Sequence, residues 1–374
     1  MTYIPAVDVN SGDRAEFLHR LITSVREQDF PYHKRSRKRM EWSSYDSAQC
    51  TEIADMLDLI RELVDEADRR VKKGRKPQPP GPGRPPVEAA DVAKVLLAQS
   101  YLGLSNRGAE GMLILFWRNL GIKRAFSYKT IERGYDRETV NEILDQVMAI
   151  SNEPVQGLET AFSIDGSGTP TNARQNYSDD RKRQNGKGKK AEGQTFPKSD
   201  RDYVYIVAVI GTRYKIFSSY QNTSRHDISE LAFVDQAVAE SKALHPGMEM
   251  LCGDGFFANR NVCRTLQEHG VTPRLLPRRN ATTKRFGVFS WTQMLMDLME
   301  DPQQWLSEYY MREASETGFS MLKMRNPGPL RKRLVPRRLT EDRLRGLVHN
   351  LRRLCYLYYT EDVETAPCLR SSSS

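Results

Sequence analysis

Residues 203–220 read YVYIVAVIGTRYKIFSSY. Apolar and aromatic residues fill positions 203–210 and return at 214–220, and the tripeptide GTR at 211–213 separates the two runs. Two such runs joined by a short segment that contains glycine are typical of a β-hairpin. The stretch therefore predicts two adjacent antiparallel strands in the second half of the chain.

Three shorter apolar runs surround this hairpin. They are AFSID at 161–165, MEMLCGD at 248–254 and VTPRLL at 271–276. Segments with helical character follow at 227–244, 259–269 and 302–325. The order strand, strand, strand, helix, strand, helix, strand, helix predicts an α/β fold, with an RNase H-like mixed five-stranded sheet and flanking helices.

The residues before the sheet are expected to be helical. Residues 1–73 are charged and helical in pattern, and residues 74–86 form a basic linker rich in proline and glycine that cannot hold a helix. Residues 87–150 predict three short helices, the third of them capped by Ser127, in a helix-turn-helix-like DNA-binding domain. The RNase H-like domain is expected at 158–358, and a disordered tail at 359–374. A plain helical bundle is the alternative for 87–150.

Composition narrows the function. The 374 residues include 57 Lys and Arg against 48 Asp and Glu, a net charge of +9, which favours a polyanionic partner such as nucleic acid. No apolar run approaches the ~20 residues of a membrane helix, so no membrane partner is expected. The N-terminus lacks the apolar region of a secretory signal. The 5 cysteines are scattered without a CxxC pair, which fits a cytoplasmic protein with reduced thiols and no zinc ribbon.

Two aspartates stand where catalytic ligands are expected. Asp165 and Asp254 each end a predicted strand and precede a glycine. Side chains at the carboxyl ends of neighbouring strands converge in open sheets, and two such carboxylates suit Mg²⁺ or Mn²⁺. The alternative for each is a simple Asp-Gly turn, which on its own is the commoner use of the motif.

A third motif lies in the last predicted helix of the sheet domain. Residues 309–323 read YYMREASETGFSMLK, in which Tyr309, Arg312, Glu316 and Lys323 match Y-x2-R-x3-E-x6-K. On one continuous helix the other three would lie within roughly 40° of Glu316, whereas Glu313 would be about 60° off that stripe. A second stripe is expected to pack on the sheet. Its members are Tyr310, Ala314, Thr317, Met321 and Met324. A surface ladder of ion pairs is the alternative.

With these motifs the chain resembles the DDE transposases of prokaryotic insertion sequences, in the group marked by a Y-R-E-K signature. The resemblance covers about residues 84–358. It implies that Asp165, Asp254 and Glu316 are the catalytic residues and hold two Mg²⁺ or Mn²⁺ ions for phosphoryl transfer. It also implies that Tyr309, Arg312 and Lys323 are DNA-binding residues. The two cations would contact phosphates, and Tyr309 would donate to a phosphate oxygen or orient Glu316.

The resemblance further implies partners. They are the terminal inverted repeats of an insertion sequence and a target DNA, with a homodimer formed on the DNA, in the cytoplasm at the nucleoid. Lys129 and Arg133, in the helix that follows Ser127, are the expected DNA-binding residues of the helical domain. Basic stretches at 174–201, 274–285 and 323–353 are further candidates for contacts with the DNA backbone.

Two other functions remain open on the sequence. One is a catalytically idle DNA-binding protein derived from a transposase, which the intact Asp165, Asp254 and Glu316 set argues against. The other is a metal-dependent endonuclease without strand transfer. Two further residues are expected to be structural: Asp227 as a helix cap, and Trp291 as part of the core.

Overall fold

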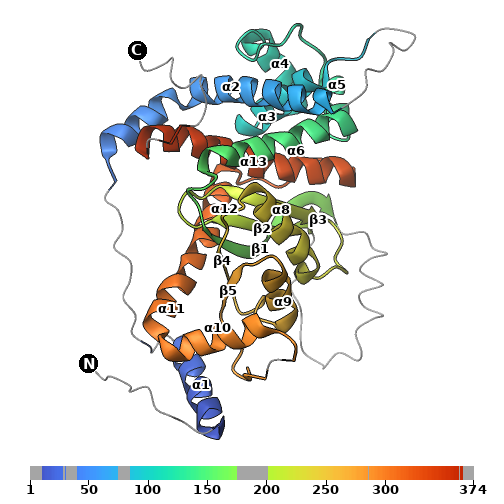
Figure 1. Cartoon of the computed structure of the whole chain (residues 1–374). Helices are drawn as coiled ribbons and strands as arrows, with labels where there is room; N and C mark the ends of the chain where they lie inside the picture. The colour runs from blue at the N-terminus through green and yellow to red at the C-terminus, as the bar shows by residue number, and fades with distance from the viewer. Residues whose placement is uncertain are drawn as a thin grey trace.

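The computed structural model describes most of the chain (Figure 1). The described residues are 11–27, 30, 40–74, 85–174, 201–284, 286–361 and 363–364. The basic run at 33–39, most of the linker, most of the basic loop at 174–201 and most of the expected tail therefore lie outside the described residues.

The five strands form one mixed sheet. They are β1 (Ala161–Arg174), β2 (Arg201–Gly211), β3 (Phe217–Thr223), β4 (Met250–Gly253) and β5 (Thr272–Leu275). Their order is β3-β2-β1-β4-β5. The pairs β1–β2 and β2–β3 are antiparallel, whereas β1–β4 and β4–β5 are parallel. This arrangement confirms the predicted RNase H-like sheet.

Strand β1 is longer than the sequence predicted. The expected strand ended at Asp165, but β1 runs on to Arg174 and pairs with β2 from Phe162↔Gly211 to Pro170↔Tyr203. Gly166, Ser167 and Gly168 read as turn residues in isolation. The backbone ladder offered by the long strand β2 outweighs that local preference, so Asp165 lies within a strand.

One hydrophobic core joins the sheet to helices from two separate parts of the chain. They are α1 (Ser11–Arg26), α8 (Val234–Leu244), α9 (Arg260–Glu268), α10 (Phe289–Glu300) and α11 (Pro302–Tyr309). Phe162, Ile164, Val207 and Val209 point into this core. Because side chains alternate along a strand, the intervening Ile206, Ala208 and Ile210 face the other side, where α12 (Glu313–Arg325) packs.

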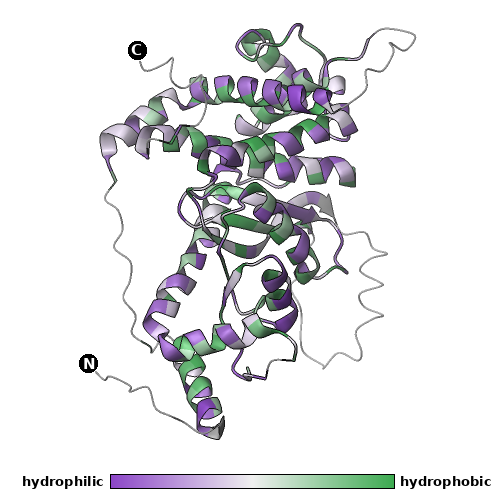
Figure 2. Cartoon of the chain, in the orientation of Figure 1, coloured by the Kyte–Doolittle hydropathy of each residue, from purple (hydrophilic) through white to green (hydrophobic). Residues whose placement is uncertain are grey.

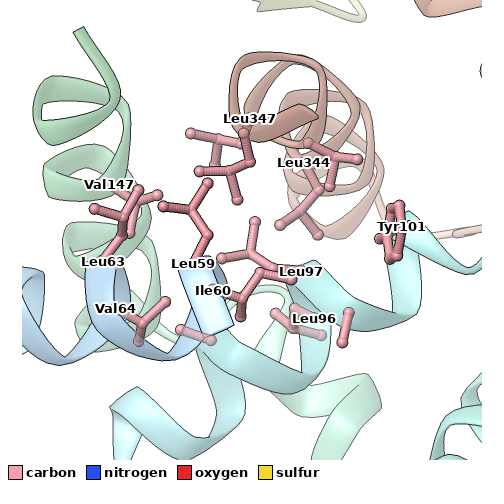
Figure 3. Packing of buried hydrophobic residues seen from close by; sticks show 14 of the residues in the cluster. Leu59, Ile60, Leu63, Val64, Leu96, Leu97, Tyr101, Val147, Leu344 and Leu347 are labelled. Atoms are coloured by element: carbon pink, nitrogen blue, oxygen red, sulfur yellow. The ribbon is translucent and has the colours of Figure 1, made fainter. Parts of the chain in front are cut away.

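A separate helical layer lies beyond that second face (Figure 1). It contains α2 (Trp42–Lys73), α3 (Ala89–Tyr101), α4 (Asn106–Phe116), α5 (Tyr128–Gly134), α6 (Glu138–Asn152) and the long α13 (Val335–Thr360). Apolar and polar residues alternate along these helices in Figure 2, as amphipathic packing requires. Leucines and valines of α2, α3, α6 and α13 meet in one core (Figure 3). Helices α1 and α2 thus contribute to different cores.

Helix α13 joins the helical layer to the sheet. Its Leu344 and Leu347 belong to the helical core, while Asn350 is fully buried against β3. Asn350 Oδ1 accepts the backbone N–H of Phe217 at 2.8 Å, and its Nδ2 donates to the carbonyl oxygen of the same residue at 2.9 Å. No helix of the described residues is long and apolar enough to cross a membrane, and no disulfide joins the cysteines among them.

The prediction of one continuous helix over 302–325 is wrong. Helix α11 ends at Tyr309, a 3-10 turn η3 spans Tyr310–Arg312, and α12 begins at Glu313. Three residues at about 120° rather than 100° each rotate the following helix by roughly 60°. The stripe predicted to pack on the sheet is therefore also wrong: Ala314 is buried, but Met324 is 77% exposed. The buried face instead consists of Ala314, Ser315, Gly318, Phe319 and Leu322.

Candidate active site

Asp165 and Asp254 lie side by side at the point where β4 ends. Ile164 pairs with Gly253 in the parallel ladder of β1 and β4, and each aspartate is the next residue of its chain segment. Adjacent strands lie about 4.8 Å apart, so this register brings the two half-buried residues together. The convergence expected from the two strand ends is thus present, although β1 itself continues.

The hydrogen bonds of the two aspartates are local. Oδ1 of Asp165 accepts the N–H of Gly166 at 2.9 Å, and Oδ1 of Asp254 accepts the N–H of Phe256 at 2.9 Å. In the described part of the chain no hydrogen bond is formed by Oδ2 of either residue. Each carboxylate therefore has one oxygen engaged by its own loop and one available to a ligand.

Glu316 approaches from the first turn of α12. It lines an open cleft of about 620 Å³ together with Asp165 and Lys323. Oε1 of Glu316 accepts a hydrogen bond from Nη1 of Arg312 at 2.5 Å, and the Glu316 side chain is 54% exposed. The predicted Arg312, Glu316 and Lys323 group is therefore gathered beside Asp165 despite the break in the helix.

The charges of the site act on one another. Burial raises the pKa of Asp165, and the negative charges of Asp254 and Glu316 raise it further, while the N–H of Gly166 and the guanidinium of Arg312 oppose the shift. Carboxylates that destabilise each other's ionised forms in this way form a site that favours a positive ligand. The three predicted catalytic residues thus share one electrostatic environment.

Tyr309 lies beneath this group rather than at its surface. Its side chain is 3% exposed and stacks on Trp305, with ring centroids 5.3 Å apart. The guanidinium of Arg312 lies over the Tyr309 ring, 5.5 Å from its centroid. Burial raises the pKa of Tyr309 to about 12. In this position the Tyr309 ring supports the guanidinium of Arg312.

Lys129 and Arg133 lie at a different place. They are exposed one turn apart on α5 and line a cavity with Arg107 and Arg337, apart from the cleft of the carboxylates. Of the two residues expected to be structural, Asp227 is not a helix cap: it is exposed and ion-paired with Arg225 at 2.8 Å, and Ser229 caps the 3-10 turn Glu230–Phe233 that precedes α8. Trp291 is 4% exposed and its indole N–H donates to the Thr282 carbonyl at 2.8 Å, which confirms its place in the core.

Comparison with known proteins adds a relative. No family model matches the chain. It is 28% identical over 339 residues to a protein of Archaeoglobus fulgidus named "Probable transposase for insertion sequence element ISA1214", which covers 90% of this chain and 93% of that protein. The chain is therefore similar in sequence, over most of its length, to a protein named as an insertion-sequence transposase. The resemblance inferred from its motifs is confirmed at this level.

A solved structure also matches part of this chain. The crystal structure of a pre-cleavage Mos1 transpososome aligns with 69% of this chain and 84% of that chain, at 12% identity and a TM-score of 0.22. Because that TM-score is low, the RNase H-like assignment rests on the order and direction of the five strands.

Sequence reasoning missed three residues of this chain that lie around Asp165 and Asp254. Oγ of the fully buried Ser163 lies 3.0 Å from Oγ of Ser315 and 3.2 Å from the Arg312 carbonyl oxygen, so it ties the start of α12 to β1. Ser163 precedes Asp165 by two positions and therefore shares its face of the strand. A serine inside an apolar strand is the only signal that the sequence offers.

The other two missed residues are Glu230 and Arg26, which lie close to the glycines that follow the two aspartates. A Cβ on Gly166 would lie 2.2 Å from Oε2 of Glu230, and a Cβ on Gly255 would lie 2.7 Å from Nη2 of Arg26. Glu230 thus brings a fourth carboxylate next to Asp165, and Arg26 brings a cation from α1 to the loop after Asp254. No local pattern marks either residue, because both reach the site from distant segments.

The carboxylates do not form a closed metal cage. Among the residues that the structure describes, no three His, Cys, Asp or Glu side chains are grouped so as to hold an ion. The ion pair between Arg312 and Glu316 accounts for part of this. In chemical terms the donor set nevertheless fits a hard divalent cation, since it consists of carboxylate oxygens with Oδ2 of both aspartates available.

Close packing of α12 on the sheet yields a stability prediction. A Cβ on Gly318 would lie 2.3 Å from Cδ1 of Ile210. Gly318→Val is expected to destabilise the fold by about 1–3 kcal/mol through overpacking and to displace the helix that carries Glu316. Thermal unfolding measures the effect. Gly111→Val is the matched control, because Gly111 lies in α4 with nothing within 4 Å of an added Cβ. Equal destabilisation by both variants would contradict the packing argument.

Proposed function

We propose that the chain is a transposase that binds the ends of an insertion sequence, cleaves the DNA there and joins the ends to target DNA, as a homodimer on the DNA. The observation that carries the proposal is that Asp254 lies beside Asp165 on the next strand, while Asp165 and Glu316 of α12 line one open cleft. The relationship to an insertion-sequence transposase supports it independently.

The proposal includes metal dependence. Asp165, Asp254 and Glu316 would hold two Mg²⁺ or Mn²⁺ ions, which when bound supply charge stabilisation for displacement at phosphorus. Glu316 would exchange its ion pair with Arg312 for a bound ion. That exchange would release a guanidinium beside the cleft at the moment when a DNA phosphate needs a partner.

The cations of the cleft would hold the substrate. Arg312 is seated on the Tyr309 ring and fixed through its carbonyl to Ser163, so its guanidinium is preorganised to bind a phosphate bidentately. Lys323, exposed two turns after Glu316, would act as a point charge on a neighbouring phosphate. Both residues raise the local concentration of a polyanion around the carboxylates.

An assay with paired substrates tests the proposal. Purified protein is incubated with DNA that carries the element's own ends and with a separate target plasmid, with Mg²⁺ or with EDTA. Cleavage at the ends followed by covalent joining to the target, only with the metal, is the expected result. Cleavage without joining would assign an endonuclease. End binding without cleavage in Mg²⁺ would assign an idle DNA-binding protein.

A further inference from the structure

Two adjoining cavities lie between the helical layer and the segment that follows α12. Their volumes are about 850 Å³ and about 450 Å³, and they share Ser105, Asn106, Glu132 and Arg337. One wall is built from α4, α5 and the end of α3, and the other from residues 325–337. Together they form one continuous depression, called here the basic groove.

Exposed cations stand on both walls of the basic groove. They are Arg107, Lys129 and Arg133 on the helical wall, and Arg325, Arg331 and Arg333 on the facing wall. In the described part of the chain none of the six forms an ion pair. The cations of α2 behave differently: Arg61, Arg69 and Lys72 are paired with Asp58, Glu66 and Asp68. The groove therefore carries positive charge that the protein itself does not compensate.

The two acids inside the groove, Glu132 and Glu341, have partners other than the side chains of the six exposed cations. Glu132 accepts hydrogen bonds from Nζ of Lys332 at 2.6 Å and from Nη1 of Arg337 at 3.0 Å. Glu341 accepts the backbone N–H groups of Arg331 and Lys332, each at 2.9 Å. Glu132 thus fixes the two walls to each other and is compensated by Lys332 and Arg337, so it forms no ion pair with the outer cations.

The groove is also fixed to the catalytic cleft. Leu330 donates its N–H to the Pro170 carbonyl at 2.8 Å and accepts the Asn172 N–H at 2.9 Å, so the facing wall is bound to β1, the strand that carries Asp165. At the end of α12, Lys323 lines the cleft and Arg325 lines the groove. A bound polymer can therefore extend from one into the other along the last turn of α12.

We propose that the basic groove binds the sugar-phosphate backbone of duplex DNA that adjoins the cleaved bond. The proposal rests on the proposed function. Cations distributed over two facing walls match a polymer of phosphates better than a single phosphate group, on which they would have to converge. In this proposal Arg331 and Arg333 on the facing wall contact the same DNA as Lys129 and Arg133 on the helical wall. The two pairs are about two hundred residues apart in the sequence.

Salt-dependent binding tests this groove. Affinity for a labelled duplex of unrelated sequence is measured by fluorescence anisotropy in EDTA at several salt concentrations. Arg331→Gln with Arg333→Gln is expected to weaken binding roughly tenfold and to lower the slope of log K against log salt by about 0.9 for each lost phosphate contact. Arg107→Gln with Lys129→Gln should give a comparable change from the other wall.

The matched control is Arg118→Gln with Arg264→Gln. Both arginines are exposed, neither forms an ion pair among the described residues, and neither lines the groove. If the control lowers affinity and slope as much as the groove variants do, net charge and not the groove explains binding. Unchanged binding by both groove variants, or tighter binding of a single-stranded RNA than of the duplex, would also overturn the proposal. Circular dichroism checks that each variant is folded.

This experiment is separable from the test of catalysis. Binding is measured without metal, so it does not require the carboxylates to act. An active Asp165→Asn variant would end the proposed metal-dependent mechanism and leave the groove result standing. Normal DNA binding by all groove variants would refute the proposed role of the basic groove, and the proposed cleavage mechanism would be unaffected.

Discussion

Asp165→Asn and Asp254→Asn are each expected to reduce metal-dependent DNA cleavage by roughly 1000-fold or more, which corresponds to about 4 kcal/mol of lost transition-state stabilisation. An amide keeps the shape of the side chain but has no charge to hold a divalent cation. The loss should be similar for the two residues, because the parallel register places them at equivalent positions beside each other.

The same two variants should remain folded. Asp254 and Glu316 oppose the ionisation of Asp165, so removing one negative charge relieves repulsion in the metal-free protein. We therefore expect a melting temperature equal to or above that of the unsubstituted protein, together with lost activity. Added Mg²⁺ or Mn²⁺ should raise the melting temperature of the unsubstituted protein and have a smaller effect on either variant.

Asp227→Asn is the control for this pair. Asp227 also lies in the segment that follows a strand, but it is exposed and paired with Arg225. Its substitution should leave cleavage and the metal-induced thermal shift unchanged. If Asp165→Asn cleaves at the normal rate, or if all three variants lose activity alike, the assignment of the two aspartates fails.

The five strands and the adjacent positions of Asp165 and Asp254 could be predicted from the sequence because their signals are local. Alternating or continuous apolar runs mark the strands, and Asp-Gly after such a run marks a strand end. The extension of β1 beyond Asp165 was missed because its stability comes from pairing with β2, which lies more than thirty residues later. Local preference for a turn gave the wrong end of the strand for that reason.

The segment from α11 to α12 shows what the sequence alone could not predict, namely the break between the two helices. The Y-R-E-K spacing selected residues of which Glu316 and Lys323 line the cleft with Asp165, but the assumption of a continuous helix gave them the wrong surroundings. The 3-10 turn depends on Ser163, which holds the Arg312 carbonyl from another strand, and on stacking of Tyr309 against Trp305. Glu230 and Arg26 were missed for the same kind of reason, since a contact across the fold leaves no periodic trace in the chain.

Glu316→Gln is expected to abolish both hydrolysis and strand transfer, and added Mn²⁺ should not fully restore either. Glu316 lines the cleft with Asp165 and its charge acts on that residue. Its substitution removes one half-exposed ion pair, which is worth at most about 1 kcal/mol to the fold. Loss of activity in a variant that melts normally would therefore report on chemistry and not on folding.

Glu313→Gln is the matched control, one turn earlier on the same helix. Glu313 is exposed, does not line the cleft and does not act on the pKa of Asp165. Its charge instead reaches Lys215, where burial lowers the pKa and Glu313 is among the groups that oppose this. Glu313 therefore faces the turn between β2 and β3, and its variant should keep most activity.

The reverse result would have structural consequences. A dead Glu313→Gln variant beside an active Glu316→Gln variant would require α12 to begin in a different rotational phase when DNA is bound. The η3 turn would have to rewind into α-helix, which breaks the contact of Ser163 with the Arg312 carbonyl. Arg312 would then leave the Tyr309 ring, and Arg312 and Lys323 would lose their assigned places at the phosphates. Measuring both variants under the same conditions thus tests the helix register and the phosphate contacts together.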